Sequence, residues 1–233
     1  MWWGRLPACP DCTPFHPSAM STATPPFHPA VAMTSEPTSL KAARTGGLVI
    51  ISGPSGAGKS TVVHQLLRQK QLPLVLSVSA TTRTPRPGET DGVNYHFLSK
   101  DDFQRRREAG EFLEFKEVFG RGDWYGTLQS EVASGLEAGK WVILEIDVEG
   151  AMSVLAAHPD AVTIFIHCGS LEELERRLRQ RNTESEASIQ RRLEVARGEL
   201  ALQDRYTWQI NNSDVQQSVH QICEILAREG KKE

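Results

Sequence analysis

Residues 53–60 read Gly53-Pro54-Ser55-Gly56-Ala57-Gly58-Lys59-Ser60, which fits the pattern G-x-x-x-x-G-K-[ST] of a phosphate-binding loop. The apolar run Leu48–Ser52 comes directly before it and predicts a buried strand, and a helical pattern follows through about Lys70. Glycines in this context let backbone N–H groups converge on phosphate oxygens at a helix N-terminus. A glycine-rich turn that binds nothing would need neither the Lys-Ser pair nor the flanking elements. We therefore predict a binding site for nucleotide phosphates.

The polar residues of this loop have distinct expected roles. Lys59 would reach the β- and γ-phosphates, and the hydroxyl of Ser60 would ligate Mg²⁺. The loop does not identify the phosphate acceptor, because ATPases, GTPases, sulfotransferases and small kinases all use it. The residues expected to hold the donor nucleotide are Gly53, Pro54, Ser55, Gly56, Ala57, Gly58, Lys59, Ser60 and Thr61.

Apolar segments alternate with helical patterns from Gly47 onward. This alternation predicts βαβ units with a parallel sheet, and therefore an α/β fold. We expect strands at Leu48–Ser52, Leu74–Ser79, Tyr95–Leu98, Phe112–Val118, Trp141–Asp147, Thr163–Cys168 and Trp208–Asn211. Besides the helix that ends near Lys70, we expect helices at Lys100–Glu108, Gln129–Ala138, Ser170–Arg181, Ser188–Leu202 and Val215–Arg228.

Residues 1–45 differ from the rest of the chain. Eight of the 13 prolines fall here among Ser, Thr and Ala, and such a segment cannot bury enough apolar surface to offset its ordering entropy. We predict a disordered N-terminal extension, with a transit peptide or a true start at Met20 or Met33 as alternatives. Cys9 and Cys12 form a single CxxC without a second ligand pair, so neither a zinc site nor a redox pair is favoured.

The composition is that of an ordinary globular protein, with 39% apolar and 24% charged residues in a chain of 233. A formal net charge of -3 gives no reason to expect binding to nucleic acid or to a membrane surface. The longest apolar runs, such as Trp141–Ile146, are too short to span a bilayer. We therefore expect a cytoplasmic protein with neither a nucleic-acid nor a membrane partner.

A second anion-binding segment follows the second expected strand. Residues 79–89 read SATTRTPRPGE, and Arg83 and Arg86 lie close together on this proline-stiffened loop. Ligands of α/β proteins bind beyond the carboxyl ends of strands, and two guanidinium groups there suit a phosphate monoester. Taken alone, the pattern is equally compatible with a solvated basic loop.

Seven motifs together resemble the guanylate kinase family. They are Ile50–Thr61, Val78–Glu89, Asp91–Phe97, Glu111–Glu114, Trp124–Thr127, Leu144–Gly150 and Leu171–Leu193. The resemblance spans Gly47 to about Glu229, with the motifs in the family's order and nearly its spacing. The chain departs from the family pattern in the longer segment Gly120–Trp124, in Ala80 for a serine, and in Asn182 where a glycine is usual.

The resemblance implies a P-loop three-layer α/β fold with a parallel central sheet, a small mixed β subdomain that binds GMP, and a helical lid. The family-like domain would span 46–233, with its core in 46–78, 140–170 and 200–233. The GMP-binding part would lie in 79–130 and the lid at about 171–199. The implied activity is transfer of the γ-phosphoryl group of ATP to GMP, with Mg²⁺ as cofactor.

Two alternatives remain open. The first is a kinase for another nucleoside monophosphate, such as AMP or UMP, which would have apolar or amide groups in place of Glu114 and Asp147. The second is a guanylate-kinase-like module that binds proteins and has no kinase activity. Such modules typically lose the loop lysine or the ATP-clamping arginines, and this chain retains both.

The resemblance also assigns residues to GMP. Its phosphate would be bound by Arg83, Arg86, Tyr95 and Tyr125, with Glu89 orienting the loop. Its base would face Ser79, Glu114, Thr127 and Asp147. Guanine presents an N1–H and an exocyclic amine side by side, so a carboxylate such as Glu114 can accept from both. Adenine has no N1–H donor, and a polar site rejects a ligand that leaves its groups unpaired.

Two acids end the expected strand Trp141–Asp147. Asp147 has the position of the acid that assists Mg²⁺ in P-loop sites, so it could also serve the metal through water. Glu145 occupies a position that is usually acidic in the family, and this chain has Glu there instead of Asp.

Arginines on the two lid helices form the last group of candidates. By resemblance Arg177, Arg181 and Arg192 are lid and catalytic residues that grip the ATP phosphates together with Lys59. The chemistry needs them, because charge spreads over the phosphoryl oxygens during transfer. The remaining lid arginines are expected to pair with glutamates on solvated helix faces, and these are Arg176, Arg179 and Arg191.

Overall fold

The computed structural model describes residues 46–118, 122–180 and 185–231. The predicted N-terminal extension with Cys9 and Cys12 lies outside the described residues. So do Arg181 and Asn182 of the lid, and residues 119–121 of the lengthened segment.

The central sheet has five parallel strands in the order β2-β7-β1-β8-β9. Their bounds are Leu74–Leu76, Trp141–Glu145, Leu48–Ser52, Val162–His167 and Trp208–Asn211. The strand that leads into the phosphate-binding loop, β1, is central and fully buried. Near-continuous apolar strands are typical of a parallel sheet that is covered on both faces.

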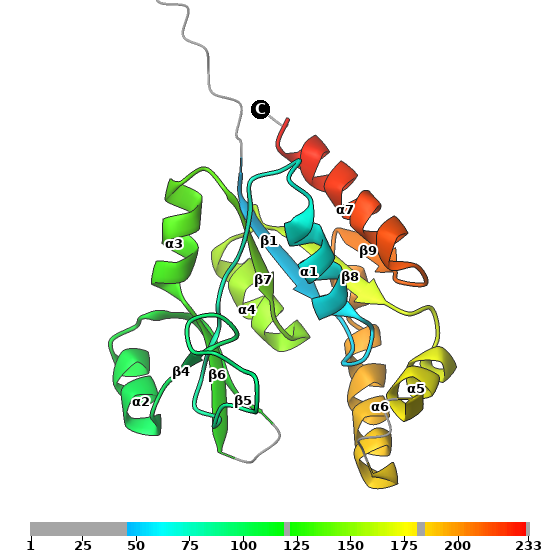
Figure 1. Cartoon of the computed structure of the whole chain (residues 1–233), viewed down its shortest axis with the longest axis horizontal. Helices are drawn as coiled ribbons and strands as arrows, with labels where there is room; N and C mark the ends of the chain where they lie inside the picture. The colour runs from blue at the N-terminus through cyan, green and yellow to red at the C-terminus, as the bar shows by residue number, and fades with distance from the viewer. Residues whose placement is uncertain (1–45, 119–121, 181–184, 232–233) are drawn as a thin grey trace, which may run out of the picture. The chain divides into compact units, whose positions relative to one another are not determined.

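Helices cover both faces of this sheet (Figure 1). Side chains alternate along β1, so Val49 and Ile51 pack in one core cluster and Leu48 and Ile50 in the other. The first cluster contains residues of α1 (Lys59–Arg68) and α7 (Val215–Glu229). The second contains residues of α3 (Gln129–Glu137) and α4 (Val148–Ala157). The predicted three-layer α/β fold with a parallel sheet is confirmed.

A second, mixed sheet has four strands in the order β4-β3-β6-β5. They span His96–Phe97, Ala80–Thr81, Asp123–Leu128 and Phe112–Val118. The pair β3–β4 is parallel and the pairs β3–β6 and β5–β6 are antiparallel. Helix α2 (Lys100–Glu108) packs on this sheet through Phe103, which contacts Ala80, Phe112 and Leu128 in a separate small core. The small mixed sheet of the predicted fold class is therefore present.

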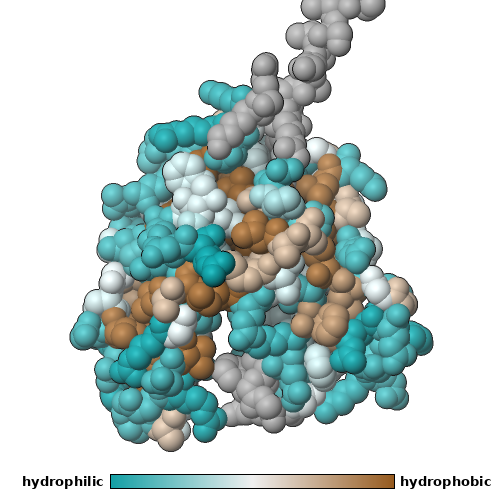
Figure 2. Space-filling model, turned by 180° about the vertical axis from the view of Figure 1, so that it is seen from behind, coloured by the Kyte–Doolittle hydropathy of each residue, from teal (hydrophilic) through white to brown (hydrophobic). Residues whose placement is uncertain are grey.

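The last pair of helices has its own apolar cluster. Helix α5 (Leu171–Gln180) and helix α6 (Glu186–Leu200) pack through Leu174, Leu178, Ile189 and Leu193. The backbone N–H of Glu173 donates to Ser170 Oγ at 3.2 Å, so Ser170 caps the N-terminus of α5. A short 3₁₀ turn, η1 (Gln203–Arg205), then leads into β9. Seen from behind, hydrophilic residues cover much of the surface and apolar ones lie between them (Figure 2).

Helix α4 and strand β6 are present although the sequence did not predict them. Helix α4 is short, apolar on most sides and has Gly150 in its first turn, so it lacks a clear helical stripe. A Cβ at Gly150 would lie 3.0 Å from Oε2 of Glu114, so a side chain there would press on this carboxylate. Strand β6 follows the lengthened segment and contains Gly126, which weakens its strand signal.

Candidate active site

The phosphate-binding loop joins the end of β1 to the start of α1, as predicted. Gly53, Gly56 and Gly58 all have positive φ angles, 139°, 102° and 92°. A Cβ at Gly53 would collide with the carbonyl oxygen of Ile166, and one at Gly58 with the amide of Asn212. The glycines are therefore needed both for the backbone turn and for close packing against β8 and the end of β9.

Lys59 reaches back over this loop. Its Nζ donates to the carbonyl oxygens of Gly53 at 2.5 Å and of Pro54 at 3.1 Å. An ammonium group held inside the loop's curve is where phosphate oxygens bind in sites of this type.

The hydroxyl of Ser60 meets an acid from the neighbouring strand. Ser60 Oγ donates a 2.6 Å hydrogen bond to Oε1 of Glu145, the last residue of β7. Asp147 lies beyond the strand end, where it is the N-cap of α4 and accepts from the backbone N–H of Gly150 at 2.8 Å. Two oxygen donors, Ser60 and Glu145, therefore lie together beside the loop and suit a hard cation such as Mg²⁺.

Arg83 organises the predicted acceptor loop. Its guanidinium binds both carboxylate oxygens of Glu89 at 2.9 Å each, and its Nε donates to the hydroxyl of Tyr125 at 3.0 Å. The hydrogen bond to Glu89 is the largest factor that raises the pKa of Arg83, and the same bond lowers the pKa of Glu89. The backbone N–H of Arg86 also donates to Glu89, at 2.7 Å, while the Arg86 side chain is exposed.

Two tyrosines complete this cluster. The rings of Tyr95 and Tyr125 lie edge to face with centroids 5.8 Å apart, and the guanidinium of Arg83 lies 5.4 Å from the Tyr95 centroid. Burial raises the pKa of Tyr95, so its hydroxyl stays protonated and can donate to an anion. The structure thus brings Arg83, Glu89, Tyr95 and Tyr125 together.

Glu114 is the carboxylate that the small sheet directs toward α4. Its Oε1 accepts a 2.7 Å hydrogen bond from Thr127 of the adjacent strand β6. Burial raises the pKa of Glu114, and the hydrogen bond from Thr127 opposes this shift. Atoms of Glu114 and Asp147 both lie within 3.4 Å of the position that a Cβ at Gly150 would take, so the two acids are neighbours.

Ser79 lies in the chain segment just before β3, on the same side of the site. Its carbonyl oxygen accepts from the backbone N–H of His96 at 2.9 Å, which aligns β4 beside β3. Its side chain is partly buried.

Two lid arginines contact the phosphate-binding loop directly. Arg177 donates to the carbonyl oxygen of Asn212 at 2.9 Å and lies 3.5 Å from that of Ala57, and its Nε binds Glu173. Arg192 Nη1 donates to Ser55 Oγ at 3.1 Å. The structure therefore places both arginines beside the loop that would hold the phosphates.

The other lid arginines behave differently. Arg176 pairs with Glu173, and Arg179 pairs with Glu175 and Glu186, as expected for solvated helix faces. Arg191 is exposed on α6. Arg181, the third predicted phosphate-gripping arginine, lies outside the described residues.

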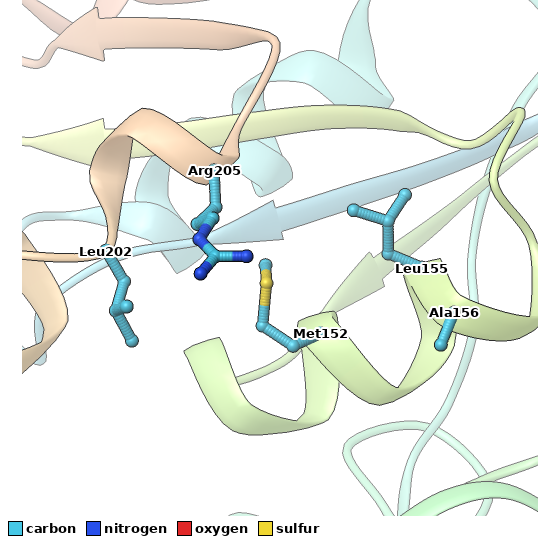
Figure 3. Close-up of a pocket in the computed structure, with 5 residues that line it drawn as sticks. All are labelled: Met152, Leu155, Ala156, Leu202 and Arg205. Atoms are coloured by element: carbon cyan, nitrogen blue, oxygen red, sulfur yellow. The ribbon is translucent and has the colours of Figure 1, made fainter.

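A cavity of about 390 Å³ lies elsewhere, between α4 and η1. Its lining consists of Met152, Leu155, Ala156, Leu202 and Arg205, and Figure 3 shows the Arg205 guanidinium extending toward Met152. None of these residues belongs to the phosphate-binding loop or to the Arg83 cluster, and the lining has no acid. This cavity is therefore not the nucleotide site.

The fold and the site together define a class of enzyme. A P-loop with Lys59 and Ser60 binds a nucleoside triphosphate, and the Arg83 cluster on a separate small sheet suits a second phosphate group. Glu114 lies on β5, the edge strand of that sheet, and Asp147 at the N-cap of α4 is its neighbour. This combination is that of a nucleoside monophosphate kinase.

Comparison with known proteins identifies the family. The family model for guanylate kinase matches residues 45–229. A guanylate kinase from Rhodopirellula baltica is 59% identical over 192 residues, which cover 82% of this chain and 92% of that protein. One from a Synechococcus species is 47% identical over 79% of this chain and 83% of its own length. The crystal structure of guanylate kinase from Anaplasma phagocytophilum matches with a TM-score of 0.66 at 32% identity, covering 81% of this chain and 88% of that one. The chain belongs to the guanylate kinase family.

Asn212 and Lys116 lie near the site and were not among the candidates from the sequence, which named Glu145 only as an acid at the end of its strand. Glu145 contacts Ser60, Asn212 supports the loop, and Lys116 pairs with Asp147 at 3.2 Å. The signal for Glu145 and Asn212 was their position at the carboxyl ends of β7 and β9, where ligands of a parallel sheet bind. Lys116 had no such signal, because its contacts depend on helix α4, which Asp147 caps and which the sequence did not predict.

Proposed function

We propose an assignment of residues for the reaction of this family. The chain transfers the γ-phosphoryl group of ATP to GMP, giving ADP and GDP. The observation that carries the acceptor assignment is the partly buried carboxylate of Glu114, held by Thr127 on the same sheet that bears the Arg83 cluster. An ionised carboxylate there accepts from N1–H and the amine of guanine together, which adenine cannot offer.

The GMP phosphate binds to the guanidinium groups of Arg83 and Arg86 and to the hydroxyls of Tyr95 and Tyr125. Glu89 supports this arrangement because it holds the side chain of Arg83 and the backbone of Arg86 in one network. The base lies against Ser79, Glu114, Thr127 and Asp147. In this proposal residues 79–130 form the acceptor part, and residues 46–78, 140–170 and 200–233 form the core.

The ATP phosphates bind to the loop from Gly53 to Thr61, with Lys59 at the β- and γ-phosphates. Catalysis in such a site consists of positioning and charge neutralisation. Arg177 and Arg192 already contact the loop, and with Arg181 they close the lid, residues 171–199, over the transferred group.

Ser60 and Glu145 would hold Mg²⁺. Within the described residues no cluster of three or more His, Cys, Asp or Glu could hold a metal by itself. Mg²⁺ at a kinase site needs only one or two protein ligands besides phosphates and water, so the pair at 2.6 Å fits. When bound, the ion neutralises charge on the β- and γ-phosphate oxygens.

None of the helices in the described ranges has the length and apolarity to cross a bilayer. Both described cysteines, Cys168 and Cys223, are free thiols. Free thiols and the use of ATP fit a reducing compartment, so we place the reaction in the cytoplasm.

A comparison of acceptors tests this assignment. ATP-dependent ADP formation is measured with GMP, AMP, UMP and dTMP, for the unaltered protein and for Glu114→Gln. We expect strong preference for GMP in the unaltered protein. In the variant we expect a loss of at least tenfold in kcat/KM for GMP, because the amide oxygen can accept from one guanine donor while the amide NH₂ faces the other. Equal kcat/KM for GMP in the two proteins would refute the role of Glu114.

A further inference from the structure

Lys116 joins the small sheet to the core through two ion pairs. Its Nζ lies 3.2 Å from Oδ2 of Asp147 and 2.5 Å from Oε2 of Glu149. Lys116 is in β5, opposite Tyr125 of β6. Asp147 and Glu149 are the N-cap and a first-turn residue of α4, which packs on the central sheet. One ammonium group thus bridges the acceptor sheet and the helix that follows β7.

This bridge fixes the direction of the Asp147 carboxylate. Oδ1 accepts from the backbone N–H of Gly150 at 2.8 Å, and Oδ2 faces Lys116. The side chains of Lys116 and Asp147 are 38% and 37% exposed, so the pair is partly shielded from solvent. Burial lowers the pKa of Lys116, but the bond to Glu149 and the charge of Asp147 outweigh it and the pKa is raised overall. The lysine therefore remains charged.

The same lysine lies beside Glu114. Residues 114 and 116 are two apart in β5, so their side chains share a face of the strand. A Cβ at Gly150 would lie 3.0 Å from Glu114 Oε2 and 3.3 Å from Asp147 Oδ1. Two carboxylates that close together repel each other, and Lys116 is the nearby cation that offsets this repulsion.

We propose that Lys116 is a positioning residue for the guanine base, which holds β5 against α4 so that Glu114 and Asp147 both face the acceptor. The inference rests on the proposed roles of these two acids in binding GMP. ATP binds to other elements, the loop after β1 and the lid. Loss of the lysine should therefore affect GMP and ATP unequally.

The test is Lys116→Met, which keeps the length of the side chain and removes its charge. We expect KM for GMP to rise about tenfold, the factor that corresponds to the loss of one hydrogen bond to a charged group. KM for ATP should stay within about twofold. Lys116→Arg should recover most of the loss. Lys140→Met, an exposed lysine before β7, is the matched control and should change neither constant.

A double-mutant cycle separates positioning from general stabilisation. If Lys116 acts through Asp147, Lys116→Met should have little further effect on KM for GMP in an Asp147→Asn background. Calorimetric binding of GMP to Lys116→Gln gives a second measure if the Met variant folds poorly, and weaker binding is expected. An unchanged KM for GMP, or an equal rise in both KM values, would overturn the inference.

Parallel measurement of Glu114→Gln distinguishes this failure from failure of the proposed function. Loss of GMP selectivity in Glu114→Gln without an effect of Lys116→Met defeats only the role of Lys116. Retention of GMP selectivity in Glu114→Gln defeats the base assignment itself, and the inference with it.

Discussion

Nδ2 of Asn212 donates a 2.8 Å hydrogen bond to the carbonyl oxygen of Ala57, which ties the segment after β9 to the phosphate-binding loop. The amide oxygen of Asn212 accepts from Ser218 Oγ at 3.1 Å, and its backbone carbonyl accepts from Arg177 at 2.9 Å. Asn212 is 3% exposed. One buried residue therefore connects the loop with α7 and with the lid helix α5.

Replacing this residue should damage both stability and ATP binding. Asn212→Ala leaves the buried carbonyl of Ala57 and the hydroxyl of Ser218 without the amide. We expect a loss of about 1–3 kcal/mol in the free energy of unfolding, measured by urea denaturation. KM for ATP should rise more than KM for GMP, because the support acts on the donor loop. The neighbouring Asn211→Ala is the control, since Asn211 is exposed, and equal effects in both variants would contradict the prediction.

The pH dependence of GMP use should report Glu114. Burial raises its pKa above the ordinary value of 4.5, so as pH falls its carboxylate is protonated, and stops accepting from guanine, earlier than an exposed glutamate would. GMP has its own phosphate ionisation near pH 6, which affects every variant alike. The ratio of kcat/KM between the unaltered protein and Glu114→Gln cancels it. We expect this ratio to be largest near pH 8 and to fall on acidification with a midpoint above 4.5. A ratio that does not vary with pH would exclude titration of Glu114.

The local parts of the site could be predicted from the sequence, and the long-range pairings could not. The phosphate-binding loop depends on three glycines and their flanking strand and helix, which all lie within about twenty residues. The bidentate contact of Arg83 with Glu89 is also local, because six positions separate them. The contact of Ser60 with Glu145 could not be predicted in this way, because it depends on β7 lying next to β1 in the sheet. Alternating strands and helices predict a parallel sheet, but they do not determine its strand order.

The contact between Lys116 and Asp147 shows a second limit of prediction from the sequence. Their contact requires helix α4, whose apolar residues and Gly150 give no helical stripe. The sequence placed Asp147 at the end of a strand, and the structure has it as a helix N-cap, with its carboxylate turned toward Lys116. The residue was correctly placed near the carboxyl edge of the sheet, yet its surroundings depended on an element that was not predicted.

Glu199 should make stability depend on pH. Its carboxyl lies on α6, and burial is the main factor that raises its pKa to about 7, with Asp147 and Glu149 adding to the rise. Lys59 and Lys116 act in the opposite direction. The folded protein therefore binds a proton between about pH 4.5 and 7 that the unfolded chain has released, so stability from this group is lost as pH rises through that window.

Glu199→Gln should remove this loss of stability at high pH, because an amide does not ionise. The difference in Tm between variant and unaltered protein, without nucleotide, should be small at pH 5 and should favour the variant by several degrees at pH 8. Glu194→Gln on the same helix is the matched control, because Glu194 is 75% exposed and should give no such trend. A Tm difference independent of pH for Glu199→Gln would show that folding does not raise the pKa of this carboxyl.

The magnesium requirement should depend on Glu145 more than on Asp147. Ser60 Oγ and Glu145 Oε1 are 2.6 Å apart, whereas Asp147 is turned to Gly150 and Lys116. Glu145→Gln keeps the side-chain size and removes the charge that attracts a hard cation. We expect the Mg²⁺ concentration for half-maximal activity to rise about tenfold or more, while the affinity for GMP, measured by calorimetry without metal, stays unchanged. Asp147→Asn should do the reverse, weakening GMP binding and leaving the Mg²⁺ dependence intact. If the Mg²⁺ dependence moved in Asp147→Asn and not in Glu145→Gln, the metal would be served by Asp147 through water, and Glu145 would only anchor the serine of the loop.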